Sequence, residues 1–489
     1  MAERNLSRQT LFWHDYETTG TNPQKDSPVQ FAGVRTDYEF NQLEEPLVVY
    51  CKPSLDSLPH PDACLITGIT PAIADKLGLC QAEFTRLIYE QMARPNTCSL
   101  GYNSLRYDDE VTRNCLYRNF YDPYAREWQH GNSRWDIIDV ARAAQALRPQ
   151  GIVWPKNIDG RPDFKLEEIC KANLISHDTA HDALSDVYAT QALAKLIKKA
   201  QPKLYGFLWK NRNKSSALEL LQLGRMIPVV HISGKYPALK NCLAIVLPIC
   251  KHPENPNGVI VYDLSIDPEP LLTLSASEIR ERIFTATKDL PEGVERIPLK
   301  TVHINKCPVL APLSVIRPED ERRLELDLEA SRKNIHKINA SYGLVAKLAE
   351  VFKQQTFDLQ ESDPDLEIYT GGFFSDADKR CMALIRSMSS IELTHQRFSF
   401  SDQRLPEMLF RYRARNYPET LTNDEAAKWR KFCVERLTGL KPGAGIVLND
   451  YFARLKELHS QDNANSEMLK ELENYAFEKM HLLGIDVSS

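Results

Sequence analysis

The first 200 residues alternate between two hydrophobic patterns. Apolar residues at every second position predict strands, and a spacing of three or four positions predicts helices. The strands are expected at residues 11–16, 29–36, 47–52 and 99–102, and the helices at 82–93, after Asp108, and at 137–147, 165–172 and 181–199. Asp136 stands where it can cap the helix that begins at residue 137. This order of elements predicts a mixed α/β domain of about 200 residues.

The pattern changes after Pro202. Short apolar runs separated by Gly and Pro predict a small β-rich domain, with strands at 227–232, 242–249, 259–264 and around 301–304. Helical periodicity then dominates, at residues 328–353, 375–387, 424–437 and 465–480. We therefore expect three domains, at 1–201, 202–354 and 355–489, in a chain that is too long for a single core.

Composition narrows the class of protein. The chain is 43% hydrophobic and 26% charged, as in ordinary soluble proteins, and its most apolar run, residues 243–250, is too short to cross a membrane. The eleven cysteines contain no Cys-x-x-Cys pair, which argues against a zinc knuckle and favours a reducing compartment such as the cytoplasm. The net charge of −5 argues only weakly against a nucleic-acid partner, because acidic residues that hold metal ions can make an enzyme acidic overall.

The first chemical signal is the sequence His-Asp-Tyr-Glu-Thr-Thr-Gly at residues 14–20, at the end of an apolar strand. Side chains alternate along a strand, so Asp15 and Glu17 point to the same face. Two carboxylates on one face repel each other unless they bind a cation or share a proton. A solvated polar face is the alternative, but the apolar strand and the tight turn after it favour a metal site.

Two further acidic motifs follow. Asp108 begins a helix after a turn that contains Asn103, where simple helix capping is the alternative explanation. Asp186 lies in an alanine-rich helix, whose small residues would let the helix approach the sheet. His181 precedes that helix, and its near-neutral pKa suits a base that removes a proton from water. A lone histidine is more often structural, but two acidic motifs upstream favour a catalytic site.

The ordered motifs resemble the DEDDh family of 3′→5′ exonucleases, which carry Asp-x-Glu, an Asp after an Asn-containing turn, and His-x-x-x-x-Asp. Further segments resemble the bacterial exonuclease I family over nearly the full length. These are DDEVTRNCLYRNFYDPY at 108–124, HINKCPVL at 303–310, GFFSDAD at 372–378 and FRYRARNY at 410–417. Thr19 departs from that family, which usually has Phe there, although Asp-Tyr-Glu-Thr-Thr-Gly is common in the wider superfamily.

The resemblance implies a fold and a mechanism. The fold would be a ribonuclease H-like exonuclease domain with a mixed sheet, followed by an SH3-like β domain and a helical C-terminal domain. Two Mg²⁺ ions, with Mn²⁺ as an alternative, would lie about 3.5–4 Å apart. Asp15 would bridge them, and Glu17, Asp108 and Asp186 would complete the ligands. His181 would be the base, Glu17 would also contact the substrate, and single-stranded DNA would yield 5′-mononucleotides during repair and recombination.

Strand binding requires cations for phosphates and flat side chains for bases. Residues 113–134 are rich in both, and we expect Arg113, Tyr124 and Trp128 to contact DNA, with Lys165 at a position where the family carries Arg. For Arg411, Arg413 and Arg415, salt bridges to nearby acids are the alternative to DNA contacts. The resemblance further implies a monomer, and a basic surface for the acidic C-terminal tail of single-stranded DNA-binding protein, for which Arg148 and Arg317 are the candidates.

Other functions share some of these signals. The same chemistry could act on short RNA or on the mismatched primer end of a polymerase, although nearly 300 residues beyond the minimal fold favour a longer DNA substrate. A non-catalytic single-strand adaptor and a metal phosphohydrolase built on the pair His181-Asp182 are further alternatives.

Overall fold

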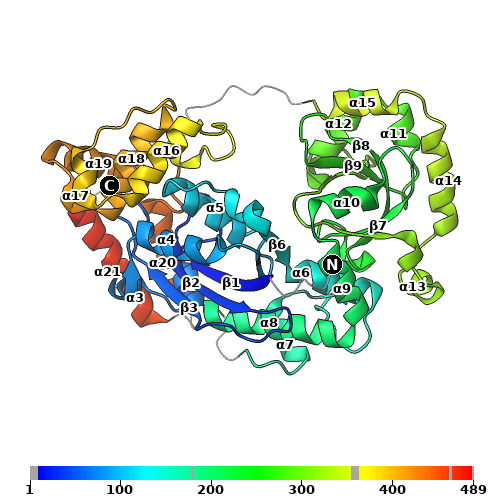
Figure 1. The fold of residues 1–489 in the computed structure, drawn as a ribbon, viewed down its shortest axis with the longest axis horizontal. Helices are drawn as coiled ribbons and strands as arrows, with labels where there is room; N and C mark the ends of the chain where they lie inside the picture. Colours follow the sequence, from blue (N-terminus) through cyan, green and yellow to red (C-terminus); the bar gives the residue numbers. More distant parts are fainter. Residues whose placement is uncertain (1–8, 178–180, 354–362, 462–464, 487–489) are drawn as a thin grey trace. The chain divides into compact units, whose positions relative to one another are not determined.

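A six-stranded mixed sheet forms the centre of the N-terminal domain (Figure 1). Its order is β4-β3-β2-β1-β5-β6, with bounds β1 Thr10–Thr18, β2 Pro28–Thr36, β3 Leu47–Cys51, β4 Gly78–Leu79, β5 Thr97–Gly101 and β6 Ser133–Asp136. Leu11, Phe12 and Trp13 are all buried, as expected of a strand covered on both faces. The predicted strands are confirmed, whereas β4 and β6 were missed because two and four residues are too few to show a period.

The computed structural model describes residues 9–177, 181–353, 363–461 and 465–486. The chain divides into two compact units, one of residues 1–133, 177–188 and 359–489, and the other of residues 134–176 and 189–358. The first unit thus combines most of the N-terminal sheet with the C-terminal helices. No helix in the described part of the chain has the length and hydropathy needed to cross a membrane.

Helices α2 to α8 lie between and after the strands of the first sheet in the sequence. They are α2 Pro61–Thr67, α3 Pro71–Leu77, α4 Gln81–Met92, α5 Asp108–Arg118, α6 Ile137–Leu147, α7 Leu166–Ala172 and α8 Ala183–Ala200. Asp136 caps α6 as predicted, because its side chain accepts a hydrogen bond from the backbone N–H of Ile138. The short helices α2 and α3 were not predicted, although each begins with Pro at a position that needs no N–H donor.

The second sheet is antiparallel and has the order β10-β9-β8-β7-β11. Its strands are β7 Val229–Ile232, β8 Leu243–Lys251, β9 Gly258–Asp263, β10 Leu299–His303 and β11 Val309–Pro312, of which β11 was missed. The helices are α9 Pro202–Lys210, α10 Lys214–Leu221, α11 Glu269–Thr273, α12 Ala276–Phe284, α13 Pro318–Arg323, α14 Leu328–Asn339 and α15 Leu344–Val351. The prediction of one helix over 328–353 is wrong, because Gly343 adopts a left-handed φ of 76° and separates α14 from α15.

The C-terminal part is helical. Its helices are α16 Asp376–Ser387, α17 Ser390–His395, α18 Arg404–Asn416, α19 Asn423–Leu437, α20 Leu448–His459 and α21 Ser466–Leu483. The predicted boundary between the second and third domains, at 354/355, lies outside the described residues. Arg415 of α18 forms salt bridges of 2.8 Å with Asp56 and 2.6 Å with Asp365. These buried pairs connect α18 to the loop after β3 and confirm that this arginine serves a salt-bridge network.

Candidate active site

Four carboxylates converge from three elements of the first unit. Asp15 and Glu17 share one face of β1, and Glu17 is only 9% exposed. Asp108 begins α5, and its Oδ1 accepts a hydrogen bond of 3.1 Å from the backbone N–H of Tyr16, which holds its side chain against β1. Asp186 lies in the first turn of α8. A strand end and two helix N-termini thus bring together residues that are up to 171 positions apart in the sequence (186 − 15).

The charges of this cluster oppose one another. Burial, followed by the charges of Asp108 and Asp186, holds the pKa of Asp15 well above its usual range. Burial and the charge of Asp186 raise the pKa of Glu17 to about 8, and burial raises the pKa of Asp186. Such repulsion is relieved when a cation occupies the cluster. Glu17, His181 and Asp186 offer ligand atoms that all lie within 4.8 Å of one another, and oxygen-rich sites of this kind suit hard divalent ions.

Two histidines flank Asp186. His181 is exposed, has a left-handed backbone with φ 65°, and lies two residues before the start of α8. The side chain of His177, which was not predicted, is buried, and its Nε2 is hydrogen-bonded to Oδ1 of Asp186. The only sequence signal for it is the repetition of His-Asp at residues 177–178 and 181–182.

The neighbouring acids have structural partners. Asp109 forms a buried salt bridge of 2.6 Å with Arg126. Asp182 caps α8 through a hydrogen bond of 3.1 Å from the backbone N–H of Ser185, and its other oxygen accepts a hydrogen bond of 3.1 Å from Gln30 of β2. Both residues therefore support the elements that carry the site.

An aromatic cluster of the same unit contains Tyr124, one of the predicted DNA contacts. The Tyr124 ring lies 6.4 Å from Tyr369 and 6.2 Å from Phe373, and Phe373 is 88% exposed. Trp128, also predicted, is 66% exposed. Tyr369 and Phe373 were missed, because nothing local in the sequence connects them with a segment some 245 residues earlier (369 − 124).

Arg113 stands behind this cluster. It is buried and forms salt bridges of 2.6 Å with Glu110 and 2.7 Å with Glu127, and its guanidinium lies 5.5 Å from the centre of the Tyr124 ring. The two glutamates occupy the N–H donors of Arg113. The side chain is therefore better placed to hold the Tyr124 ring in position than to bind a DNA phosphate.

The other predicted cations belong to the second unit. Lys165 is exposed and directly precedes α7. Arg148 and Arg317 converge on the buried carboxylate of Asp320, at 3.1 and 3.2 Å, and Arg323 joins them at 3.1 Å. Arg317 also pairs with Glu319 at 3.1 Å, so three guanidiniums face two carboxylates and leave one positive charge in excess.

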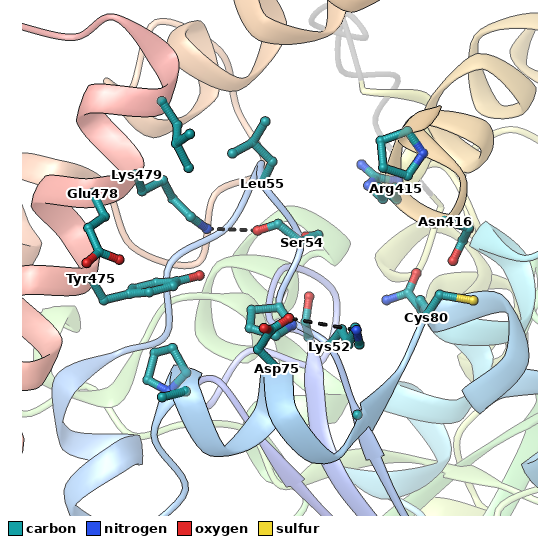
Figure 2. Close-up of a pocket in the computed structure, with 18 of the residues that line it drawn as sticks. Lys52, Ser54, Leu55, Asp75, Cys80, Arg415, Asn416, Tyr475, Glu478 and Lys479 are labelled. Carbon is teal, nitrogen blue, oxygen red and sulfur yellow. Dashed lines mark hydrogen bonds and ion pairs between the residues drawn. The ribbon is translucent and has the colours of Figure 1, made fainter. Parts of the chain in front are cut away.

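A separate pocket of about 1120 Å³ lies in the first unit, between the loop after β3 and helices α18 and α21 (Figure 2). Lys479 of α21 points toward this loop and donates hydrogen bonds to the carbonyl oxygens of Ser54, at 2.8 Å, and Ser57, at 2.5 Å. The described lining includes none of the four carboxylates, so this pocket is distinct from the candidate active site.

Comparison with known proteins decides the family. Residues 12–194 match an exonuclease family, 212–354 the exonuclease I SH3-like domain, and 362–479 the exonuclease I C-terminal domain. Exodeoxyribonuclease I of Escherichia coli is 44% identical over 98% of this chain and 100% of its own length. The chain belongs to the exonuclease I family. The predicted family and the three-part fold class are therefore confirmed.

Solved structures of the family agree in fold. An exonuclease I from Methylocaldum szegediense is 50% identical, with a TM-score of 0.93 over 96% of this chain and 100% of that one. A zinc-bound complex of E. coli exonuclease I with single-stranded DNA is 44% identical, with a TM-score of 0.91 over 97% and 100% of the two chains. This chain is thus a DNA exonuclease, a hydrolase of a family that uses divalent metal ions.

Proposed function

We propose that this exonuclease degrades single-stranded DNA in the 3′→5′ direction, releases 5′-mononucleotides, and acts in DNA repair and recombination. The observation that carries the proposal is the convergence of Asp15, Glu17 and Asp186 with raised pKa values, beside Asp108 and His181. The E. coli relative in complex with single-stranded DNA supports the choice of substrate.

The roles of the residues follow from their positions. Asp15 would hold both of two Mg²⁺ ions, and Glu17, Asp108 and Asp186 would hold one or the other. When bound, these ions supply charge stabilisation for the attacking and departing oxygens. His181 is exposed next to the carboxylates, where it can accept the proton of the attacking water. Glu17 would also contact the terminal nucleotide.

Strand binding would use the aromatic cluster and, besides it, the exposed Trp128. Tyr124, Trp128 and Phe373 offer flat faces for unstacked bases, with Arg113 supporting Tyr124. Lys165 would contribute a phosphate contact, at a position where the family carries Arg.

The excess positive charge around Asp320 suits an acidic peptide. We propose that Arg148 and Arg317, with Arg323, bind the acidic tail of single-stranded DNA-binding protein. We further propose a monomer in the cytoplasm, where its DNA substrate lies. Its domains at 1–201, 202–354 and 355–489 are supported by the family matches at 12–194, 212–354 and 362–479.

The test compares labelled substrates in Mg²⁺. A single strand labelled at its 5′ end should shorten progressively from the unlabelled end, and a strand labelled at its 3′ end should release labelled mononucleotide first. RNA of the same sequence and blunt duplex DNA should be degraded far more slowly. Preference for RNA, or initial loss of a 5′ label as mononucleotide, would contradict the proposal.

A further inference from the structure

One histidine beside the carboxylates has no role in the mechanism above. The side chain of His177 is only 6% exposed, and its Nε2 is hydrogen-bonded to Oδ1 of Asp186. Among the described residues, Nδ1 of His177 is buried without a hydrogen-bond partner. A proton on Nδ1 would therefore be an unsatisfied buried donor, which favours the tautomer with the proton on Nε2, donating to Asp186.

The two histidines beside Asp186 differ in whether they can themselves contact a bound metal ion. His181 belongs with Glu17 and Asp186 to one group of ligand atoms, whereas no such group in the described part of the chain includes His177. His177 thus contacts this group through Asp186. The exposed His181 can meet water, but the buried His177 is placed to hold a carboxylate.

Asp186 needs a partner that holds its side chain, because the neighbouring carboxylates repel it from the orientation in which it faces them. Glu17 and Asp15 repel it electrostatically, and a free side chain would turn away from them. The donor on Oδ1 fixes the side chain, together with the backbone N–H of His181, which also donates a hydrogen bond to this carboxylate. Carboxylates that bind metals are commonly held in this way, and loss of the supporting partner costs about 10–100-fold in metal affinity.

We propose that His177 is a positioning residue, which donates a hydrogen bond from Nε2 to Asp186 and thereby orients this carboxylate for the divalent cation. The inference rests on the metal site proposed above. It predicts an effect on metal affinity and not on the chemical step once metal is saturating.

The test is a calorimetric titration of the full chain with Mn²⁺, without DNA. His177→Ala should bind Mn²⁺ about 10–100-fold more weakly than the parent. His177→Gln, whose amide N–H can donate in place of Nε2, should recover most of the affinity. At saturating Mn²⁺ the kcat of His177→Ala should return to near the parent value. His459→Ala, an exposed histidine at the end of α20, is the matched control and should bind like the parent.

Parent-like or tighter Mn²⁺ binding by His177→Ala would overturn the proposal. Thermal unfolding in EDTA shows whether the variants fold. If His177→Ala does not fold, His177→Gln decides, since weak binding by that folded variant would also overturn the donor role. Asp186→Asn distinguishes failure of the proposed metal site from failure of the His177 proposal. If both Asp186→Asn and His177→Ala bind Mn²⁺ like the parent, the metal site itself is wrong. If Asp186→Asn loses binding while His177→Ala keeps it, only the role of His177 is refuted.

Discussion

Glu17→Gln should stabilise the protein when metal is absent. Burial and the Asp186 charge raise the pKa of Glu17 from 4.5 to about 8. Because the folded pKa is raised, the folded state loses stability as pH rises from about 4.5, and the full loss is reached above pH 8. At about 1.4 kcal/mol for each pH unit, the cost is roughly 3 kcal/mol at pH 7 and roughly 5 kcal/mol above pH 8. A neutral amide avoids this cost.

Thermal unfolding in EDTA measures the effect. At about 2–4 °C for each kcal/mol, the Tm of Glu17→Gln should lie roughly 6–12 °C above that of the parent at pH 7, and the two should coincide near pH 4. Saturating Mg²⁺ should stabilise the parent more than the variant, because a ligand that binds only the folded state stabilises it. Glu329→Gln, which alters an exposed glutamate of α14, should leave the Tm unchanged in EDTA at pH 7. A lower Tm for Glu17→Gln in EDTA, or a difference that does not depend on pH, would refute the account of repelling carboxylates.

Three further variants address other parts of the molecule. Burial alone would raise the pKa of Asp56, but the Arg415 and Arg436 guanidiniums hold it well below its usual range. Asp56→Asn should therefore lower the free energy of unfolding at pH 7 by about 3–5 kcal/mol, and denaturant titration should show the difference narrowing as pH falls below about 4. Trp128→Ala should weaken single-stranded DNA binding, measured by fluorescence anisotropy, by about 1–3 kcal/mol without lowering kcat at saturating DNA; an unchanged Kd would exclude stacking. Arg317→Ala should weaken binding of an acidic tail peptide by about tenfold, and equal binding would remove this residue from that surface.

Local sequence patterns were enough for part of the site. Asp15 and Glu17 follow from the two-residue period of a strand, and the Asp136 cap follows from one residue type at a helix start. The β-rich second domain was likewise visible in short apolar runs. These features depend on neighbours in the sequence, which a single sequence shows directly.

Other features depend on contacts between distant segments. Asp56 and Arg415 are separated by 359 positions, and neither position has a local pattern that predicts the buried pair. The same holds for Tyr369 and Phe373 beside Tyr124. Only the order of the family motifs predicted that Asp186 lies near Asp15. The distance between α8 and β1 depends on how the helix packs against the sheet, which no local pattern in the sequence shows. Short strands such as β4 were missed because two residues carry no period.

The most direct test of the central claim is the rate at which mononucleotides leave the 3′ end of single-stranded DNA in saturating Mg²⁺. Removal of a metal ligand costs several kcal/mol of transition-state stabilisation, so Asp186→Asn should be at least about a hundredfold slower than the parent. Asp424→Asn, an exposed acid in the first turn of α19, should match the parent. Parent-like release by a folded Asp186→Asn would contradict the assignment of the carboxylate cluster as the catalytic centre.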